Sequence, residues 1–339
     1  MHKLTFELVE AGLIDGLRVD HIDGLYDPKA YCLHLREACP KPIYLIVEKI
    51  LAGHEVLRED WGVDGTTGYE FASAATRLLA DRQGEDKLSR FYQTFTGQSD
   101  ELAAIERDAK RGIIDFEMAA ELDGLVHRLR IIASSNPRTA DFTRNGLRQA
   151  LREVVVAMPV YRTYVDQGPL DERDRRWIGA AIASARQAAP MLDPAIFDFI
   201  QQVMSIELAD MEEYDETAVQ DAAMRIQQYT GPVMAKGLED TALYRFNRLI
   251  ALSDVGEKPD RFGSDIASFH DWARARAETA PRGMLGSSSH DSKRGEDARA
   301  RIVMLSAEPD LWADAVTRWT DQLKTPSEPI DRNVARKTS

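Results

Sequence analysis

Two carboxylic acids near the start of the chain stand where a pair of buried strands would end. Asp20 closes the apolar run "GLRVD", and Glu48 closes the longer run "IYLIVE". A carboxylate that attacks an acetal carbon and a carboxylic acid that protonates the departing oxygen cleave a glycosidic bond with retention when they lie about 5 to 5.5 Å apart. The two acids therefore indicate acid and nucleophilic chemistry on a sugar linkage.

Arg18 lies two residues before Asp20 and would make the two acids different. Residues two apart in a strand share a face. The guanidinium should therefore lower the pKa of the Asp20 carboxyl, whereas the apolar setting of Glu48 should raise its pKa. The pair would then divide into nucleophile and proton donor. Two other interpretations stay open: Arg18 and Asp20 could form a structural ion pair, and Glu48 could be a solvated residue at a strand exit.

The elements that would position these acids form a strand, helix, strand pattern. Residues 16–19 predict a short strand, "PKAYCLHLREAC" predicts a crossover helix, and residues 43–50 predict a second strand that is apolar until its end. Strands joined in this way pair in parallel, so both acids should lie at the same rim of a sheet. Parallel α/β barrels build their active sites on that rim.

The rest of the chain divides into three parts by the spacing of its apolar residues. Residues 84–229 carry apolar residues at helical spacing, as in "NGLRQALREVVVAMPVYRTYV", and predict an all-helical insertion. Residues 230–325 return to short apolar runs that meet polar turns, which predicts a second α/β part. Residues 326–339 are polar and predict a frayed tail.

Composition excludes several classes of partner. The chain has 339 residues, 44% of them hydrophobic, and can bury a large core. Its formal net charge of -13 opposes binding to nucleic acid or to an anionic membrane. No apolar run near the first acids is long enough to span a bilayer, and the first ten residues lack the pattern of a secretory signal. With only Cys32 and Cys39 as cysteines, we expect a cytoplasmic protein with a neutral ligand.

Several segments resemble a known group of enzymes. "GLRVDHIDGL", "IVEKI" and "SSSHDSKRGED" occur in this order and resemble the strand-four, strand-five and strand-seven signatures of the α-amylase superfamily of glycoside hydrolases and transglycosylases. "VDGTTGYEF", "TGPVMAKGLEDTALYRFNRL" and "HDSKRGEDARARI" resemble, more narrowly, the maltooligosyltrehalose synthase family within it. The resemblance covers residues 4–320, the helical insertion included.

The resemblance implies roles for individual residues. Asp20 matches the nucleophile, Glu48 the general acid/base, and Asp291 the third carboxylate, which stabilises the distorted sugar and its positive charge. For His290, a turn or helix-cap role is the alternative to sugar binding. The expected substrate-binding residues are Arg18, His21, His290, Lys236, Glu239, Asp240, Tyr244 and Lys293.

The run "AKGLEDTALYR" is the candidate for a pocket that holds a released glucose. We expect a strand-to-helix loop here, with hydroxyl-binding groups at Lys236, Glu239 and Asp240 and a stacking ring at Tyr244. The alternative is that the two acids charge a helix N-terminus and that Tyr244 belongs to the core. Lys293 lies beside Asp291 in the sequence and could contact the sugar or compensate the carboxylates.

The implied reaction is an intramolecular transglycosylation of a maltooligosaccharide. Asp20 would form a glycosyl-enzyme, Glu48 would protonate the departing glucose, and that glucose would attack through its anomeric hydroxyl to give an α,α-1,1 linkage. The reaction requires no metal and no organic cofactor. Alternatives are α-glucan hydrolysis or maltose-to-trehalose conversion within the superfamily, and a noncatalytic carbohydrate-binding fragment.

The implied fold is a (β/α)8 TIM barrel, and only part of it fits this chain. The strand-four signature begins at residue 16, which leaves no room for three earlier strands. The sequence therefore predicts a partial barrel, with strands four and five in residues 1–83 and strands six and seven in residues 230–325. We expect the central portion of a longer enzyme.

Overall fold

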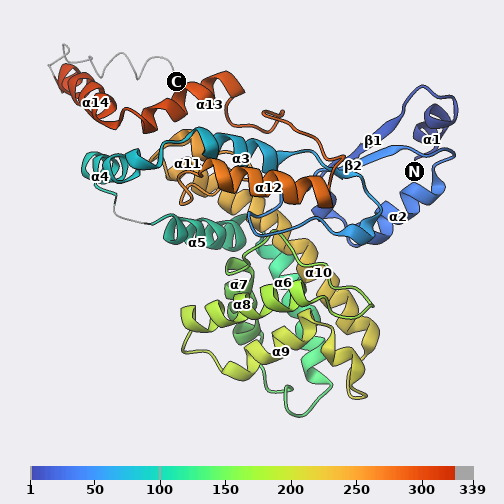
Figure 1. Ribbon diagram of the computed structural model, residues 1–339. Helices are drawn as coiled ribbons and strands as arrows, with labels where there is room; N and C mark the ends of the chain where they lie inside the picture. The colour runs from blue at the N-terminus through green and yellow to red at the C-terminus, as the bar shows by residue number, and fades with distance from the viewer. Residues whose placement is uncertain (1, 99–100, 325–339) are drawn as a thin grey trace, which may run out of the picture.

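The molecule is mostly helical and contains one small sheet (Figure 1). The structure is a computed structural model that describes residues 2–98 and 101–324. Its longer helices are α1 (Lys3–Glu10), α2 (Pro28–Ala38), α3 (Tyr69–Leu79), α4 (Glu85–Thr96), α5 (Leu102–Gly112), α6 (Ala119–Ser134), α7 (Arg144–Val156), α8 (Glu172–Ala188), α9 (Pro194–Met204), α10 (Glu216–Met234), α12 (Ile266–Thr279), α13 (Glu296–Val303) and α14 (Pro309–Lys324). None of the helices in this described part is long and apolar enough to cross a membrane.

The sheet confirms the expected parallel pairing at the start of the chain. Strands β1 (Gly16–Val19), β2 (Tyr44–Val47) and β3 (Gly65–Thr66) are hydrogen-bonded in that order, and all are parallel. Val19 pairs with Val47, so both strands end level with each other. The residues that follow, Asp20 and Glu48, therefore leave the sheet at one rim.

A compact core holds the two strand ends in place. Helix α2 is the crossover between β1 and β2, and it begins where the Asp27 side chain accepts a hydrogen bond from the Ala30 amide at 2.9 Å. Leu45 and Val47 of β2 are fully buried, and Trp61 packs into the same cluster. This packing fixes the height at which β1 and β2 stop.

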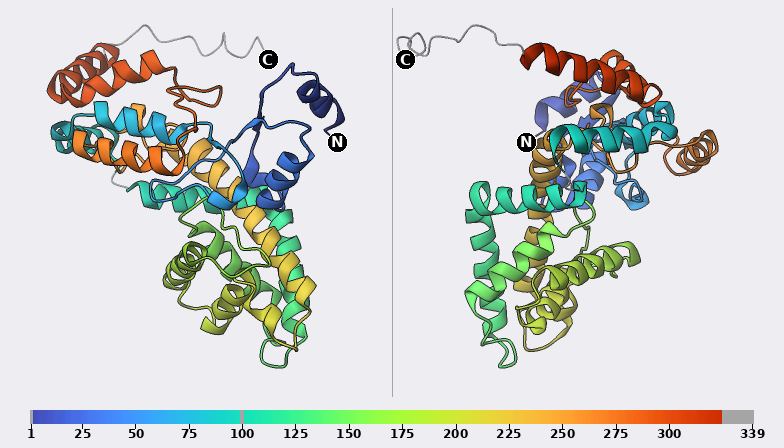
Figure 2. Two further views of the ribbon diagram at one scale, coloured as in Figure 1. Left: turned by 45° about the vertical axis from the view of Figure 1, so that its right-hand side comes forward. Right: turned by 90° about the vertical axis from the view of Figure 1, so that its left-hand side faces the viewer.

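A block of helices lies to one side of the sheet. Helices α6 to α9 and the first part of α10, drawn from green to yellow, form this block in both views of Figure 2. Its core runs from Ile114 to Val233 and is almost entirely aliphatic and aromatic. Helix α4 packs instead against α14, and α5 packs against the segment after α10. The regular elements described within residues 84–229 are all helices, and the compact block begins only near α6.

The segment expected as a strand-to-helix loop is a helix instead. Helix α10 continues past Pro232 into a wider helical segment, η6 (Ala235–Ala242), and then into the short α11 (Leu243–Arg245). Buried Leu238, Ala242 and Leu243 keep helical spacing and pack into one cluster. Packing of this face against α5 therefore overrides the loop that was expected for this run.

The expected strands of residues 230–325 are not formed in the part up to residue 324 that the structure describes. The third strand of the sheet is β3, which lies in the range where two strands were expected. Residues 283–286 run beside β3, but a single backbone bond, from the Met284 amide to the Thr66 carbonyl at 3.1 Å, joins them. A Cβ on Gly65 would lie 2.3 Å from the Gly283 Cα, so this close approach requires glycine.

Candidate active site

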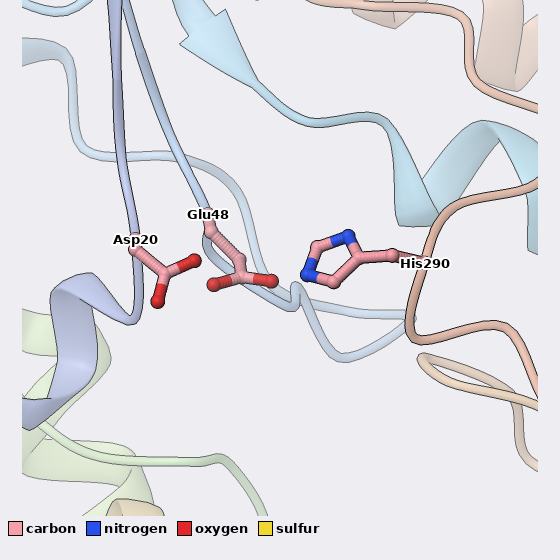
Figure 3. A group of neighbouring side chains, drawn as sticks. All are labelled: Asp20, Glu48 and His290. Carbon is pink, nitrogen blue, oxygen red and sulfur yellow. The ribbon is translucent and has the colours of Figure 1, made fainter.

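The acids at the ends of β1 and β2 lie next to each other (Figure 3). The Glu48 amide donates to the Val19 carbonyl at 2.8 Å, which continues the sheet register to this residue. The His21 amide in turn donates to Glu48 Oε2 at 2.8 Å. His21 has a φ of 42°, in the left-handed region that a residue with a Cβ rarely adopts. The turn after Asp20 is thus held in an unusual conformation by the side chain of Glu48.

Arg18 contacts both acids. Its Nη1 lies 2.6 Å from Asp20 Oδ1, and its Nη2 lies 2.9 Å from Glu48 Oε1. The sequence predicted only the first of these contacts. Because the guanidinium bridges the two carboxyl groups, it fixes their separation as well as their charge.

The two acids have opposite pKa shifts, in the directions expected. The hydrogen bond from Arg18 holds the pKa of the Asp20 carboxyl below its usual value. Burial raises the pKa of the Glu48 carboxyl, against the opposing effects of the His21 amide and Arg18. A proton in this pair therefore resides on Glu48 and leaves Asp20 ionised.

Asp291 joins this pair through Tyr69. The Tyr69 hydroxyl lies 3.2 Å from Glu48 Oε1 and 3.2 Å from Asp291 Oδ2, and it accepts a hydrogen bond from Ser289 Oγ at 3.1 Å. A phenol has one proton, so it donates to one of the two carboxylates at a time. His290 Nε2 lies 3.4 Å from Asp291 Oδ2. Acids from β1, β2 and the loop after residues 283–286 therefore meet at one place.

A cavity of about 320 Å³ opens beside these acids. Of the residues expected from the sequence, those lining it are Asp20, His21, Glu48, Glu239, Asp240, His290, Asp291 and Lys293. Ile50, Val255 and Tyr161 supply much of its apolar wall. The structure thus gathers eight of the eleven expected residues around one space, and Arg18 touches it through Asp20 and Glu48.

Besides Arg18, the expected residues that do not line this cavity are Lys236 and Tyr244. Lys236 Nζ binds Asp240 Oδ2 at 2.9 Å, one helical turn away. The Tyr244 ring is exposed, and Lys293 Nζ lies 4.7 Å from its centroid. Lys236 therefore contacts the cavity residue Asp240, and Tyr244 contacts the cavity residue Lys293. The helical form of this segment causes this, because Lys236 in η6 and Tyr244 in α11 lie on its exposed side.

Glu239 is the buried member of the same segment. Its side chain is buried, and Oε1 accepts a hydrogen bond from the Gly256 amide at 3.0 Å. Burial raises the pKa of the Glu239 carboxyl to about 7. Near neutral pH this group can therefore either donate or accept a hydrogen bond at the cavity wall.

The chain is similar to proteins of known name and to solved structures. No protein-family model matches it. A curated protein of Mycobacterium tuberculosis named as a maltooligosyl trehalose synthase is 36% identical over 303 residues, which are 89% of this chain and 36% of that protein. The solved maltooligosyltrehalose synthase of Arthrobacter ramosus has a TM-score of 0.81 and 33% identity, over 94% of this chain and 38% of that one. The chain is homologous to maltooligosyltrehalose synthases.

A solved protein from another organism shows the same similarity at lower identity. A Sulfolobus tokodaii structure, named as a hypothetical maltooligosyl trehalose synthase, has a TM-score of 0.68 and 30% identity, over 91% of this chain and 36% of that one. The present chain thus spans little more than a third of the length of the maltooligosyltrehalose synthases it matches.

Asp20, Glu48 and His290 could also hold a metal ion, since each offers a ligand atom and these atoms lie within 4.8 Å of one another. The Arg18 guanidinium already occupies the space beside both carboxylates. A cation there would be repelled by Arg18, so the arrangement favours a sugar over a metal. In this maltooligosyltrehalose synthase homologue the sequence likewise predicts no metal.

Sequence reasoning missed two supports of the site. Tyr69 is the first residue of α3, and nothing in its local sequence indicates that it bridges two acids. Asp254 is buried, and its Oδ1 accepts a hydrogen bond from the Lys293 amide at 2.9 Å while Oδ2 binds Arg299 at 3.1 Å. For Asp254, the available signal in the sequence was an acid within the short run "LSDVG".

Replacing Glu257 with Gln should reduce the loss of folding stability that occurs as the pH rises. Burial raises the pKa of the Glu257 carboxyl to about 8, against about 4.3 in an unfolded chain. The folded state keeps a proton that the unfolded state has lost, so the free energy of unfolding falls as pH rises between these values. The variant can keep the hydrogen bond from Ser73 Oγ, now 2.9 Å.

Denaturant unfolding at about pH 5 and about pH 9 measures this effect. We expect Glu257→Gln to lose less stability than the wild type between the two, while the exposed control Glu278→Gln follows the wild type. Equal losses in all three proteins would contradict the assignment of this titration to Glu257.

Proposed function

We propose that this chain carries the catalytic centre of an enzyme that converts the reducing-end α-1,4 linkage of a maltooligosaccharide into an α,α-1,1 linkage, in trehalose biosynthesis. The observation that carries the proposal is the meeting of Asp20, Glu48 and Asp291 at one cavity. The homology to maltooligosyltrehalose synthases supports the choice of substrate.

The first step uses the opposite charge states of the two acids. Ionised Asp20 attacks the anomeric carbon of the glucosyl unit next to the reducing end, and the glycosidic bond breaks. Protonated Glu48 gives its proton to the departing oxygen, so that a free glucose and a glycosyl ester of Asp20 result. Asp291 lies where a carboxylate can stabilise the positive charge that develops on the sugar ring.

The second step reverses the proton transfer. Glu48, now ionised, takes the proton of the anomeric hydroxyl of the retained glucose, and that oxygen displaces Asp20 from the glycosyl carbon. Two displacements at that carbon give net retention. The close approach of Asp20 and Glu48, with oxygens within 4.8 Å, suits this route better than the separation of about 6.5 to 9.5 Å that inversion needs.

Isomerisation requires the glucose to stay and water to be excluded. The cavity of about 320 Å³ is near the lower end of the range for ligand pockets. We assign the glucose contacts to Glu239, Asp240 and Lys293, with Lys236 and Tyr244 orienting the last two. His21 and His290 would bind hydroxyls of the donor unit, and Arg18 holds the acids. A glucose bound there has a high effective concentration at the glycosyl ester.

We further propose that the sheet is part of a (β/α)8 TIM barrel of the α-amylase superfamily, glycoside hydrolase family 13. Three parallel strands with acids after the first two, and residues 283–286 running along β3, support this. The proposed parts are residues 1–83 and 230–325 for the barrel, residues 84–229 for the helical insertion and residues 326–339 for a polar tail. The tail and residue 325 lie outside the described residues. We propose a cytoplasmic location and a maltooligosaccharide as partner.

Incubation of the chain with maltopentaose tests the proposed function. We expect a product of unchanged mass that has lost its reducing end. Shorter reducing sugars in place of this isomer would show an α-glucan hydrolase. Binding of maltopentaose without conversion would show a noncatalytic carbohydrate-binding protein. Either result would overturn the proposal.

A further inference from the structure

A buried ionic cluster lies directly behind the two acids. Lys49 Nζ lies 3.3 Å from Asp23 Oδ2 and 3.1 Å from Glu55 Oε1. Lys49 is 2% exposed and Asp23 4%. Breaking a buried pair of this kind strands a charge away from water, so the three groups hold one another firmly.

The cluster is fastened to the backbone of both acids. Lys49 follows Glu48, and Asp23 lies in the short helical turn η1 (Ile22–Gly24) that follows Asp20 and His21. The Ile22 amide donates to the Glu48 carbonyl at 3.3 Å. Lys49 and Asp23 thus join the two segments that carry the acids.

The segment between α7 and α8 grips the same turn. The Tyr164 hydroxyl donates to Asp23 Oδ1. Arg162 is 1% exposed, and its Nη1 donates to the carbonyls of Asp23 at 2.8 Å and Leu25 at 2.6 Å. Burying a guanidinium removes its charge from water at a high desolvation free energy, so the backbone carbonyls must provide its hydrogen bonds.

Helix α10 supplies an independent contact to this turn. The Gln228 side-chain amide donates to the Gly24 carbonyl at 2.7 Å. Gln227, next to it, binds the Val165 amide and carbonyl at 2.7 and 3.0 Å, which ties α10 to the segment that carries Tyr164. Residues of the helical insertion therefore contact the turn after Asp20 from two elements.

We propose that the helical insertion positions the acids. Tyr164 and Arg162 are positioning residues: they hold Asp23, and Asp23 together with Lys49 holds the turn after Asp20 against the segment that carries Glu48. They touch no substrate. The turn is strained at His21, whose amide binds Glu48, so a loosened turn would move the acid/base and the nucleophile apart. The effect on catalysis rests on the proposed function, whereas the effect on the turn does not.

Hydrogen exchange on Tyr164→Phe tests the structural part. Phe keeps the ring contact with Trp61, now 4.8 Å between centroids, and loses only the bond to Asp23. The matched control is Tyr229→Phe, which removes a buried hydroxyl bond to the Met118 carbonyl, 3.0 Å, inside the helical block. We expect amides 21–24 to exchange about tenfold faster in Tyr164→Phe and at the wild-type rate in Tyr229→Phe.

Two further measurements complete the test. Gln228→Met should speed the same amides by a smaller factor, and it gives an answer if Tyr164→Phe does not fold. In turnover of maltopentaose, Tyr164→Phe should lower kcat about tenfold with little change in KM, and Tyr229→Phe should change neither. Wild-type exchange at residues 21–24 in both Tyr164→Phe and Gln228→Met would overturn the inference. An inactive wild type with the expected exchange would instead count only against the proposed function.

Discussion

Glu48→Gln slows the turnover of maltooligosaccharides by about 10²- to 10⁴-fold, the usual contribution of general acid catalysis. The amide keeps the size of the side chain but has no proton to give to the departing glucose. A glucosyl fluoride needs no such proton, because fluoride leaves unaided. Its reaction with Asp20 should therefore stay near the wild-type rate and leave the glycosyl-enzyme to accumulate.

The control for this variant is Glu59→Gln, a change of the same type at an exposed residue in the short helical turn η2 (Glu59–Trp61). The first-turnover release of fluoride, compared with the rate on maltopentaose, separates the outcomes, because it reports only the attack of Asp20. Equal losses on maltopentaose and on the fluoride would show that Glu48 does not act as the acid. The pH dependence gives the same separation: the wild-type rate should fall at high pH as Glu48 loses its proton and at low pH as Asp20 gains one.

Asp291→Asn lowers kcat by about 10²- to 10³-fold with little change in KM. This is the size expected when one group that stabilises transition-state charge is removed. Asn keeps the volume of Asp291 and can still accept a hydrogen bond from Tyr69, so the geometry of the site should survive. The exposed residue at the start of α13, Asp297, gives the control Asp297→Asn. A loss confined to KM would place Asp291 in ordinary substrate binding.

The first half of the site could be predicted from local sequence. The strand, helix, strand pattern in the first fifty residues is regular, and β1 has the predicted limits. Parallel pairing then forces Asp20 and Glu48 to one rim, and Arg18 and Asp20 to one face. Local alternation and one topological rule were enough for these contacts.

The rest depends on packing between distant segments. The two residues of β3 are too few to show alternation. The loop expected around Gly237 is part of a helix, because Gly237 lets η6 pack closely on Lys110, where a Cβ would lie 2.6 Å from Lys110 Cγ. The bridge made by Tyr69 joins residues 222 positions apart, which no local pattern reports.

The same limit applies to the supports behind the site. Arg162 and Tyr164 follow an apolar run of a helical block, and nothing near them in the sequence indicates that they reach residues 23–26. The only signal in the sequence for a buried role was a charged residue next to an apolar run, and charged residues are exposed more often than buried. Three-dimensional contacts were needed to give the insertion a role at the site.

The most direct test of the central claim is to identify the residue that becomes glycosylated. The chain is treated with an α-glucosyl fluoride that carries a second fluorine at C5, which slows release of the sugar, and the digested protein is analysed by mass spectrometry. The geometry at β1 and β2 predicts one added glucosyl unit on Asp20, and none in Asp20→Asn. A label on another residue, or an unlabelled Asp20 in folded protein, would contradict it.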